Sequence, residues 1–150
     1  MSISVQTADF DVGVELAALG EVAGAGAVAS FVGVVRGGDG PDAIDAMTLE
    51  HYPGMTEKSL AAIVEEAQSR WSLLGVRVIH RVGRLLPGER IVLVAVATRH
   101  RQAAFDACAF IMDYLKTRAP FWKKEETARG AHWVDARESD DAAALRWGGQ

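Results

Sequence analysis

Short apolar runs bounded by turn residues mark the first predicted strands of this chain. Residues 27–35 are apolar and rich in β-branched side chains, and a glycine-rich turn follows them. Residues 46–52 alternate between two faces, with Met47, Leu49 and His51 on the same side. The pattern therefore predicts two strands joined by a loop.

A second pair of apolar segments predicts a hairpin. Residues 76–82 alternate between the two faces, which is typical of a half-exposed strand, and Pro87-Gly88 supplies a turn before residues 91–98. Residues 91–97 are apolar at every position, so both faces of this strand must be covered. We expect it to lie at the centre of a sheet.

Two segments carry apolar residues at helical spacing. The first begins at Thr56, which we expect to be the N-cap, and its apolar residues recur over the range 60–71. The second covers residues 102–116, and Pro120 forces the residue before it out of the helical region. The stripe predicted to pack on one side of this helix comprises Phe105, Ala109 and Met112.

The rest of the chain is predicted to end in strands and a helix. After Pro120 come an extended piece, a turn at 128–130, a strand-like piece at 132–134 and a last helix begun by Ser139. Because strands and helices are mixed without strict βαβ alternation, the predicted fold class is α+β. The 150 residues fit one domain, residues 1–150, that buries about 68% of its unfolded surface.

Composition narrows the function classes. The net charge is −4, with 20 acidic residues against 16 basic ones, which argues against a nucleic-acid binder with a broad positive surface. The apolar runs are too short to span a bilayer, and residues 1–10 lack the pattern of a secretory signal. We expect a cytoplasmic protein without a membrane or nucleic-acid partner.

Residue types that bind metals or attack substrates are few. The four histidines have no spacing that sets a metal geometry, so we expect no metal site. They are His51, His80, His100 and His132. Cys108, the only cysteine, lies in an apolar helical pattern, where a free thiol is usually a small core residue.

A dense group of cations follows the second predicted helix. It consists of Lys116, Arg118, Lys123 and Lys124, interleaved with the aromatic residues Tyr114, Phe121 and Trp122. Such rings can stack on a flat heterocycle while the cations hold a phosphate, although a solvated basic patch has the same composition. Neighbouring positive charge makes a lysine easier to deprotonate, which favours a nucleophile or general base.

Two further cationic positions stand at the ends of predicted strands. Arg99, His100 and Arg101 lie where a buried strand gives way to a helix, so the side chains and free helix amides can face an anion together. Arg36 ends another strand beside the glycine-rich loop. Each has an alternative reading as a solvated end of a strand.

The chain closely resembles the MoaE family, the large catalytic subunits of molybdopterin synthase. The resemblance covers residues 27–147. It rests on five blocks: Gly33-Val34-Val35-Arg36, Leu49-Glu50-His51-Tyr52-Pro53-Gly54-Met55, His100-Arg101, residues 110–123, and Trp133-Val134-Asp135-Ala136-Arg137-Glu138-Ser139. Agreement over five separated blocks is specific to this family.

The resemblance implies a fold, an assembly and a partner. The fold is an α/β-hammerhead with additional antiparallel β structure, and two large subunits form a central homodimer. A small ubiquitin-like sulfur-carrier subunit binds at each outer end, which gives a heterotetramer. The carrier's C-terminal Gly-Gly ends in a thiocarboxylate that threads into the large subunit. No cofactor or metal is implied.

The resemblance also implies an enzyme and its site residues. The reaction converts a cyclic pyranopterin monophosphate, precursor Z, into molybdopterin by transferring two sulfurs from the carrier. Lys116 is the implied catalytic residue and Lys123 its partner. The implied substrate-binding residues, some of them from the other protomer, are Arg36, His100, Arg101, Arg137, Phe31 and Met112. The alternative function is a non-catalytic module that binds a pterin or carrier through the same anion pocket.

Overall fold

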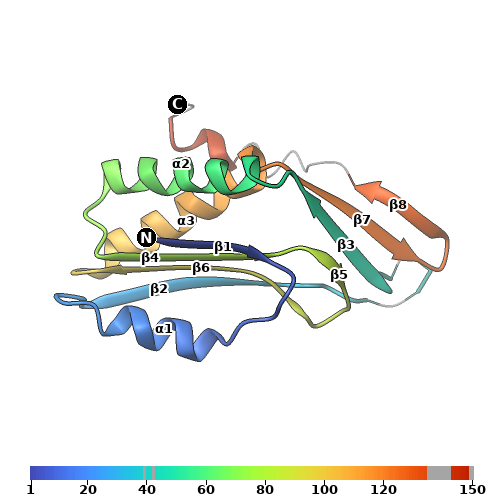
Figure 1. The fold of residues 1–150 in the computed structure, drawn as a ribbon, viewed down its shortest axis with the longest axis horizontal. Helices are drawn as coiled ribbons and strands as arrows, with labels where there is room; N and C mark the ends of the chain where they lie inside the picture. The colour runs from blue at the N-terminus through green and yellow to red at the C-terminus, as the bar shows by residue number, and fades with distance from the viewer. Residues whose placement is uncertain (39, 42, 135–142, 149–150) are drawn as a thin grey trace.

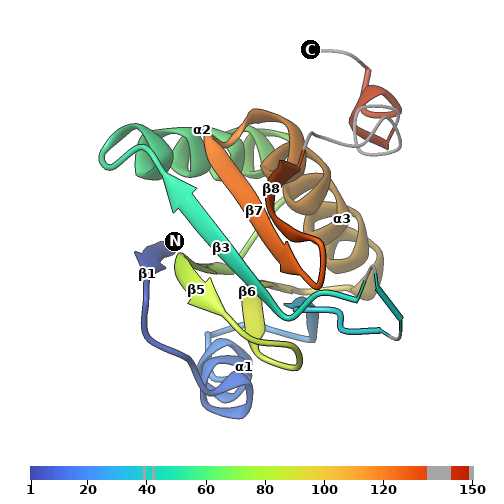
Figure 2. The ribbon, with the colours of Figure 1, turned by 90° about the vertical axis from the view of Figure 1, so that its right-hand side faces the viewer.

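Two four-stranded sheets and the helices that cover them form the computed structural model, which describes residues 1–38, 40, 41, 43–134 and 143–148 (Figure 1). The first sheet has the order β1 (Ser2–Gln6), β4 (Gly75–Arg81), β6 (Arg90–Thr98) and β2 (Ala27–Val34). The second has the order β5 (Gly83–Leu85), β3 (Ala46–His51), β7 (Phe121–Thr127) and β8 (Gly130–Val134) (Figure 2). The architecture confirms the predicted α+β class.

The first sheet is covered on both faces. Helices α2 (Met55–Arg70) and α3 (Arg101–Arg118) lie over one face, and α1 (Val12–Gly20) lies over the other (Figure 1). Strand β6 is central and buried from Val92 to Thr98, as its apolar sequence predicts. Among the described residues, no helix is long and apolar enough to cross a membrane.

The prediction that the strand at residues 76–82 is half exposed is wrong. Ile79 and Arg81 are both buried, because α1 and the segment before it cover the face that the alternation assigned to solvent. Neither α1 nor β1 was predicted from the sequence, so this second covering layer was missed.

The predicted hairpin is confirmed as a pairing, with one addition. β4 and β6 are antiparallel neighbours, but between them the chain leaves the first sheet and forms β5 in the second, where Leu85 pairs with Met47. Gly83 begins this excursion at a φ of 91°, a conformation that favours glycine. The two sheets are thus joined by one short, continuous segment.

The predicted start of the first long helix is wrong by two residues. Gly54 is the N-cap of α2, at a φ of 83°, and its N–H donates to Glu57 Oε1 over 3.0 Å. Thr56 is the second residue of α2 and fully buried, and its hydroxyl donates to Tyr52 O over 2.9 Å. A threonine that bonds to its preceding turn mimics a cap in the sequence.

Helix α3 extends one residue before and two beyond the predicted range, and it ends before Pro120 as expected. The predicted packing stripe is partly wrong, because Phe105 is 61% exposed whereas Met112 is buried. Cys108 is a core residue, as predicted, and its Sγ lies 3.6 Å from Val94 O. Burial raises the pKa of its thiol to about 11, so it remains protonated at neutral pH.

The C-terminal strands match the prediction. β7 and β8 form an antiparallel pair around the turn at residues 128–130. The start of the last helix, predicted at Ser139, lies outside the described residues.

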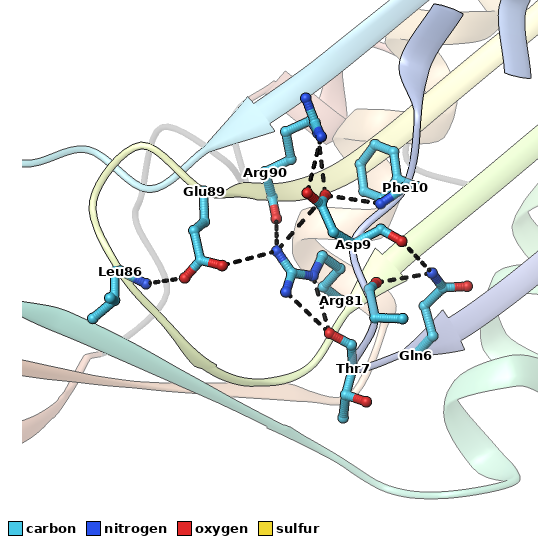
Figure 3. A network of polar contacts seen from close by, with 9 residues as sticks. Gln6, Thr7, Asp9, Phe10, Arg81, Leu86, Glu89 and Arg90 are labelled. Atoms are coloured by element: carbon cyan, nitrogen blue, oxygen red, sulfur yellow. Dashed lines mark hydrogen bonds and ion pairs between the residues drawn. The ribbon is translucent and has the colours of Figure 1, made fainter. Parts of the chain in front are cut away.

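A buried arginine joins the amino-terminal segment to the first sheet (Figure 3). Arg81 donates from Nε and Nη2 to Thr7 O over 3.1 and 3.0 Å, and from Nη1 to Arg90 O over 3.1 Å. The Arg90 side chain makes a bidentate pair with Asp9, and its hydrogen bond holds the pKa of that carboxyl below its usual value. The network fixes the chain between β1 and α1.

We expect Arg81→Met to lower the free energy of unfolding by about 2–3 kcal/mol, because it leaves the carbonyls of Thr7 and Arg90 without their donors. The matched control is Arg84→Met, which removes a 60% exposed arginine paired with Glu126 and is expected to cost less than about 1 kcal/mol. Urea denaturation measures both. Equal losses would show that the Arg81 network does not stabilise the fold.

Candidate active site

The inner face of the second sheet meets the first sheet at an aromatic contact. The Phe121 ring stacks on the His80 ring of β4, with centroids 3.8 Å apart and planes 17° from parallel. Residues two apart on a strand share a face, so Lys123 and Glu125 point to the same side of β7 as Phe121. This face is the one that carries the candidate chemistry.

His80 is buried and neutral. Its Nδ1 lies 2.8 Å from Arg81 O, and because a carbonyl oxygen only accepts, Nδ1 carries the proton. Burial is the main cause that lowers the pKa of His80 to about 4. The hydrogen bond to the Arg81 carbonyl opposes this shift, and the nearby charges of Lys116 and His51 contribute to it. A neutral imidazole therefore lies within electrostatic range of the Lys116 amine.

The two candidate catalytic lysines come from separate elements. Lys116 is exposed in the last turn of α3, and Lys123 lies on β7 about 7 Å beyond Phe121. Lys123 Nζ is 3.8 Å from Glu125 Oε2, and the other oxygen of Glu125 is 4.0 Å from His132 Nε2. Each lysine is thus related to the stacked rings of His80 and Phe121: Lys116 acts on the charge of His80, and Lys123 follows Phe121 on the same strand face.

The predicted cluster of four cations and three aromatics divides over different surfaces. Arg118 pairs with Glu66 over 3.1 Å and covers the ring of Tyr114, which is buried in the core. Adjacent residues on a strand point to opposite faces, so Trp122 and Lys124 lie on the outer face of β7. There Lys124 Nζ is 5.5 Å from the ring of Trp133. Phe121 and Lys123 share the inner face of β7, and Lys116 acts on the His80 ring on which Phe121 stacks.

Three predicted binding residues lie toward the Lys116 end of α3. Phe31 pairs with Val94, which belongs to the buried cluster that contains Cys108 and its neighbours on α3, so Phe31 is on the α3 side of the sheet. Met112 and Lys116 follow Cys108 at intervals of four residues along the same helix face. Arg36 is exposed two residues beyond β2, at the same end of the sheet.

Two predicted binding residues lie far from the lysines, at the opposite end of α3. His100 and Arg101 are exposed at the N-terminus of α3, and a helical rise over 15 residues places Arg101 about 22 Å from Lys116. A single subunit therefore does not unite them with the lysines. Arg137 lies outside the described residues.

Other candidate sites are less suited to the chemistry. Within the described part of the chain, no group of three or more His, Cys, Asp or Glu side chains is placed to hold a metal ion. A shallow hollow of about 320 Å³ lies between α2 and the end of α3. Ser59, Ala62, Ile63, Glu66 and Arg118 line it, whereas the two lysines do not.

Sequence reasoning missed three side chains around the lysines. His80 and His51 were weighed for chemistry as metal ligands, His51 was also part of a block that carries the resemblance, and Glu125 was not singled out. The alternation of Lys123 and Glu125 on one strand face was available from the sequence, but the stacking of Phe121 on His80 joins residues 41 positions apart. No local pattern predicts that contact.

Known proteins resemble this chain over most of its length. The family model described as MoaE protein matches residues 5–118. The molybdopterin synthase catalytic subunit of Ralstonia nicotianae is 61% identical over 150 residues, covering 98% of this chain and 84% of the relative. The solved structure of the molybdopterin biosynthesis MoaE protein from Burkholderia ambifaria MC40-6 is 56% identical, with a TM-score of 0.83 and coverage of 98% and 97%.

A more distant structure shares the fold. It is the protein-protein complex of subunits 1 and 2 of molybdopterin-converting factor from Helicobacter pylori 26695. The matched chain is 21% identical, with a TM-score of 0.74 and coverage of 90% of this chain and 91% of that one.

We expect the burial of His80 to make the fold sensitive to acid. The pKa is lowered from 6.5 to about 4 on folding, so the unfolded chain binds a proton first and stability is lost as pH falls between those values. The loss attributable to His80 is roughly 2–3 kcal/mol by pH 4.5. Urea denaturation at several pH values should show a shallower slope for His80→Phe than for the wild type. Identical slopes would contradict the assignment.

Proposed function

Because the chain belongs to the MoaE family of molybdopterin synthase catalytic subunits, we propose that Lys116 and Lys123 carry its sulfur-transfer chemistry. Membership makes the chain an enzyme of molybdenum cofactor biosynthesis. Its substrate is a cyclic pyranopterin monophosphate, and two sulfurs from the thiocarboxylated tail of a small carrier subunit convert it into molybdopterin.

The convergence of the two lysines on the His80–Phe121 stack is the observation that supports this assignment. Lys116 acts electrostatically on a buried imidazole that carries no charge of its own at neutral pH and stacks on Phe121. Glu125 fixes Lys123 from the same strand face. An amine in that setting can transfer protons or engage the carrier's terminal carbonyl, whereas a second fixed cation stabilises developing negative charge.

The substrate's phosphate remains anionic throughout, so fixed cations can position it. Among the described cationic candidates, Arg36 follows β2 at the end of the sheet that faces the Lys116 end of α3, and Phe31 and Met112 provide the apolar wall. Holding the reactants in one geometry removes much of the entropic barrier to their reaction. His100, Arg101 and Arg137 complete the proposed binding set.

We infer that the site is shared between two copies of the chain in a homodimer. The 22 Å or so between Arg101 and Lys116 is too long for both to contact one small substrate in a single subunit. β2 is an edge strand of the first sheet and exposes Val28, Phe31 and Val34, an apolar edge that a second copy would cover. With one carrier at each outer end, the assembly is a heterotetramer.

We expect Lys116→Ala and Lys123→Ala each to lower turnover by about a hundredfold or more, because each removes a group that moves protons or stabilises charge. The assay mixes the purified chain with thiocarboxylated carrier and the pterin precursor and measures dithiolene product. Lys124→Ala is the matched control, since Lys124 lies on the opposite face of β7, and it should remain within about twofold of wild type. Full activity of Lys116→Ala would favour a non-catalytic binding module.

The shared site predicts complementation between two inactive variants. A mixed dimer of Lys116→Ala and Arg101→Ala subunits has one site with both changes and one site with neither. Random mixing should therefore restore about a quarter of wild-type activity, because half the dimers are mixed and half their sites are intact. Product formation after co-refolding measures this. Activity no higher than that of the separate variants would place both residues in the same subunit's site.

A further inference from the structure

His51 carries a polar atom that its surroundings do not satisfy. Among the side chains of the described residues, its Nδ1 is the buried nitrogen or oxygen that has no hydrogen-bond partner. Burying such an atom without a partner costs free energy, so native folds keep one mainly where function requires it. The atom therefore marks a place where another molecule completes the contact.

The position of His51 connects this atom to the candidate active site. His51 ends β3 and pairs with Phe121 of β7, the neighbouring strand in Figure 2, and directly opposite residues share a face. The rings of His51 and Phe121 have centroids 6.5 Å apart. Lys123 pairs with Leu49 on that same face, two residues along each strand. His51 thus lies on the strand face that carries Lys123.

The two imidazoles beside Phe121 differ in what they offer. His80 uses its Nδ1 proton on the carbonyl of Arg81, which fixes its ring within the protein. His51 lies close enough for its charge to lower the pKa of His80, and Lys116 acts on the same ring. His51 is therefore the one of these two histidines with an Nδ1 left to bind a reactant.

We propose that His51 Nδ1 donates a hydrogen bond to an anionic oxygen or sulfur of a reactant held between Lys116 and Lys123. The inference rests on the proposed function. Among the described charged groups, Lys123 and its partner Glu125 lie on the same sheet face as His51, and Lys116 acts on the neutral His80 ring beside Phe121. The cations favour an anion, and either the carrier's thiocarboxylate or the substrate's cyclic phosphate supplies one. His51 is a binding residue here, and no covalent bond changes.

Two substitutions separate this role from a structural one. His51→Phe keeps a flat ring but removes the unsatisfied nitrogen, so the free protein should melt at the same temperature or higher while binding weakens about tenfold. His51→Asn places an amide nitrogen near the position of Nδ1 and should recover most of that binding. Thermal melting of the free chain and binding by calorimetry measure the two effects.

The source of the anion is identified by the ligand whose binding changes. One arm titrates the chain with the carrier ending in an ordinary Gly-Gly carboxylate, and with a carrier lacking both glycines. If His51 contacts the tail, His51→Phe weakens binding of the first carrier and leaves that of the second unchanged. If it contacts the phosphate, binding of both carriers is unchanged and the KM for the pterin precursor rises about tenfold. Either result supports the inference.

The control for melting is His132→Phe, which removes a 57% exposed imidazole and so should give no gain in melting temperature. The inference is overturned if His51→Phe changes neither carrier affinity nor the KM for the precursor by more than about twofold. A lower melting temperature together with equal weakening toward both carriers would overturn it too, because it indicates a packing role. Such failures leave the Lys116→Ala result untouched, so they are distinguishable from a failure of the proposed function.

Discussion

The stacking of Phe121 on His80 holds the second sheet against the first, and the candidate chemistry depends on it. The chain leaves α3 at Arg118 and enters β7 at Phe121, and the stack fixes the start of this strand, which carries Lys123, against β4. Deep burial keeps the His80 imidazole uncharged at neutral pH, and the Arg81 carbonyl fixes the orientation of its ring. The backbone of Arg81 thus orients His80, while its side chain fixes the amino-terminal segment. One residue links the stability of the fold to the geometry of the site.

The sequence predicted those features that depend on local pattern. Residues 91–97 were placed in a central strand because every position is apolar, and α3 was placed within two residues of its ends because Pro120 limits it. The start of α2 was predicted wrongly. Thr56 was assigned as the N-cap, whereas its hydroxyl bonds back to Tyr52 from within the helix. Residues of β1 and α1 were overlooked because their role appears only when they cover Ile79 and its neighbours.

The site was predicted in its residue types more than in its arrangement. Lys116 and Lys123 were selected for their charge density, and the same criterion included Arg118 and Lys124, which contact Glu66 and Trp133 instead. Strand alternation separates Lys123 from Lys124, so that part was available without coordinates. The separation of Arg101 from Lys116 depends on the length of α3. Because one subunit keeps these two cations apart, the separation supports a site shared with a second subunit.

Strand β5 has a consequence for how the protein tolerates change in chain length. Between Arg81 and Arg90 the chain pairs with β3 in one sheet while its flanks pair with each other in the other sheet. An inserted or deleted residue in this connection would move the side chains of β5 to the opposite face of their sheet unless the turn at Pro87 absorbed it. Surface connections usually accept such indels, but here we expect natural variants to conserve spacing more strictly than residue identity.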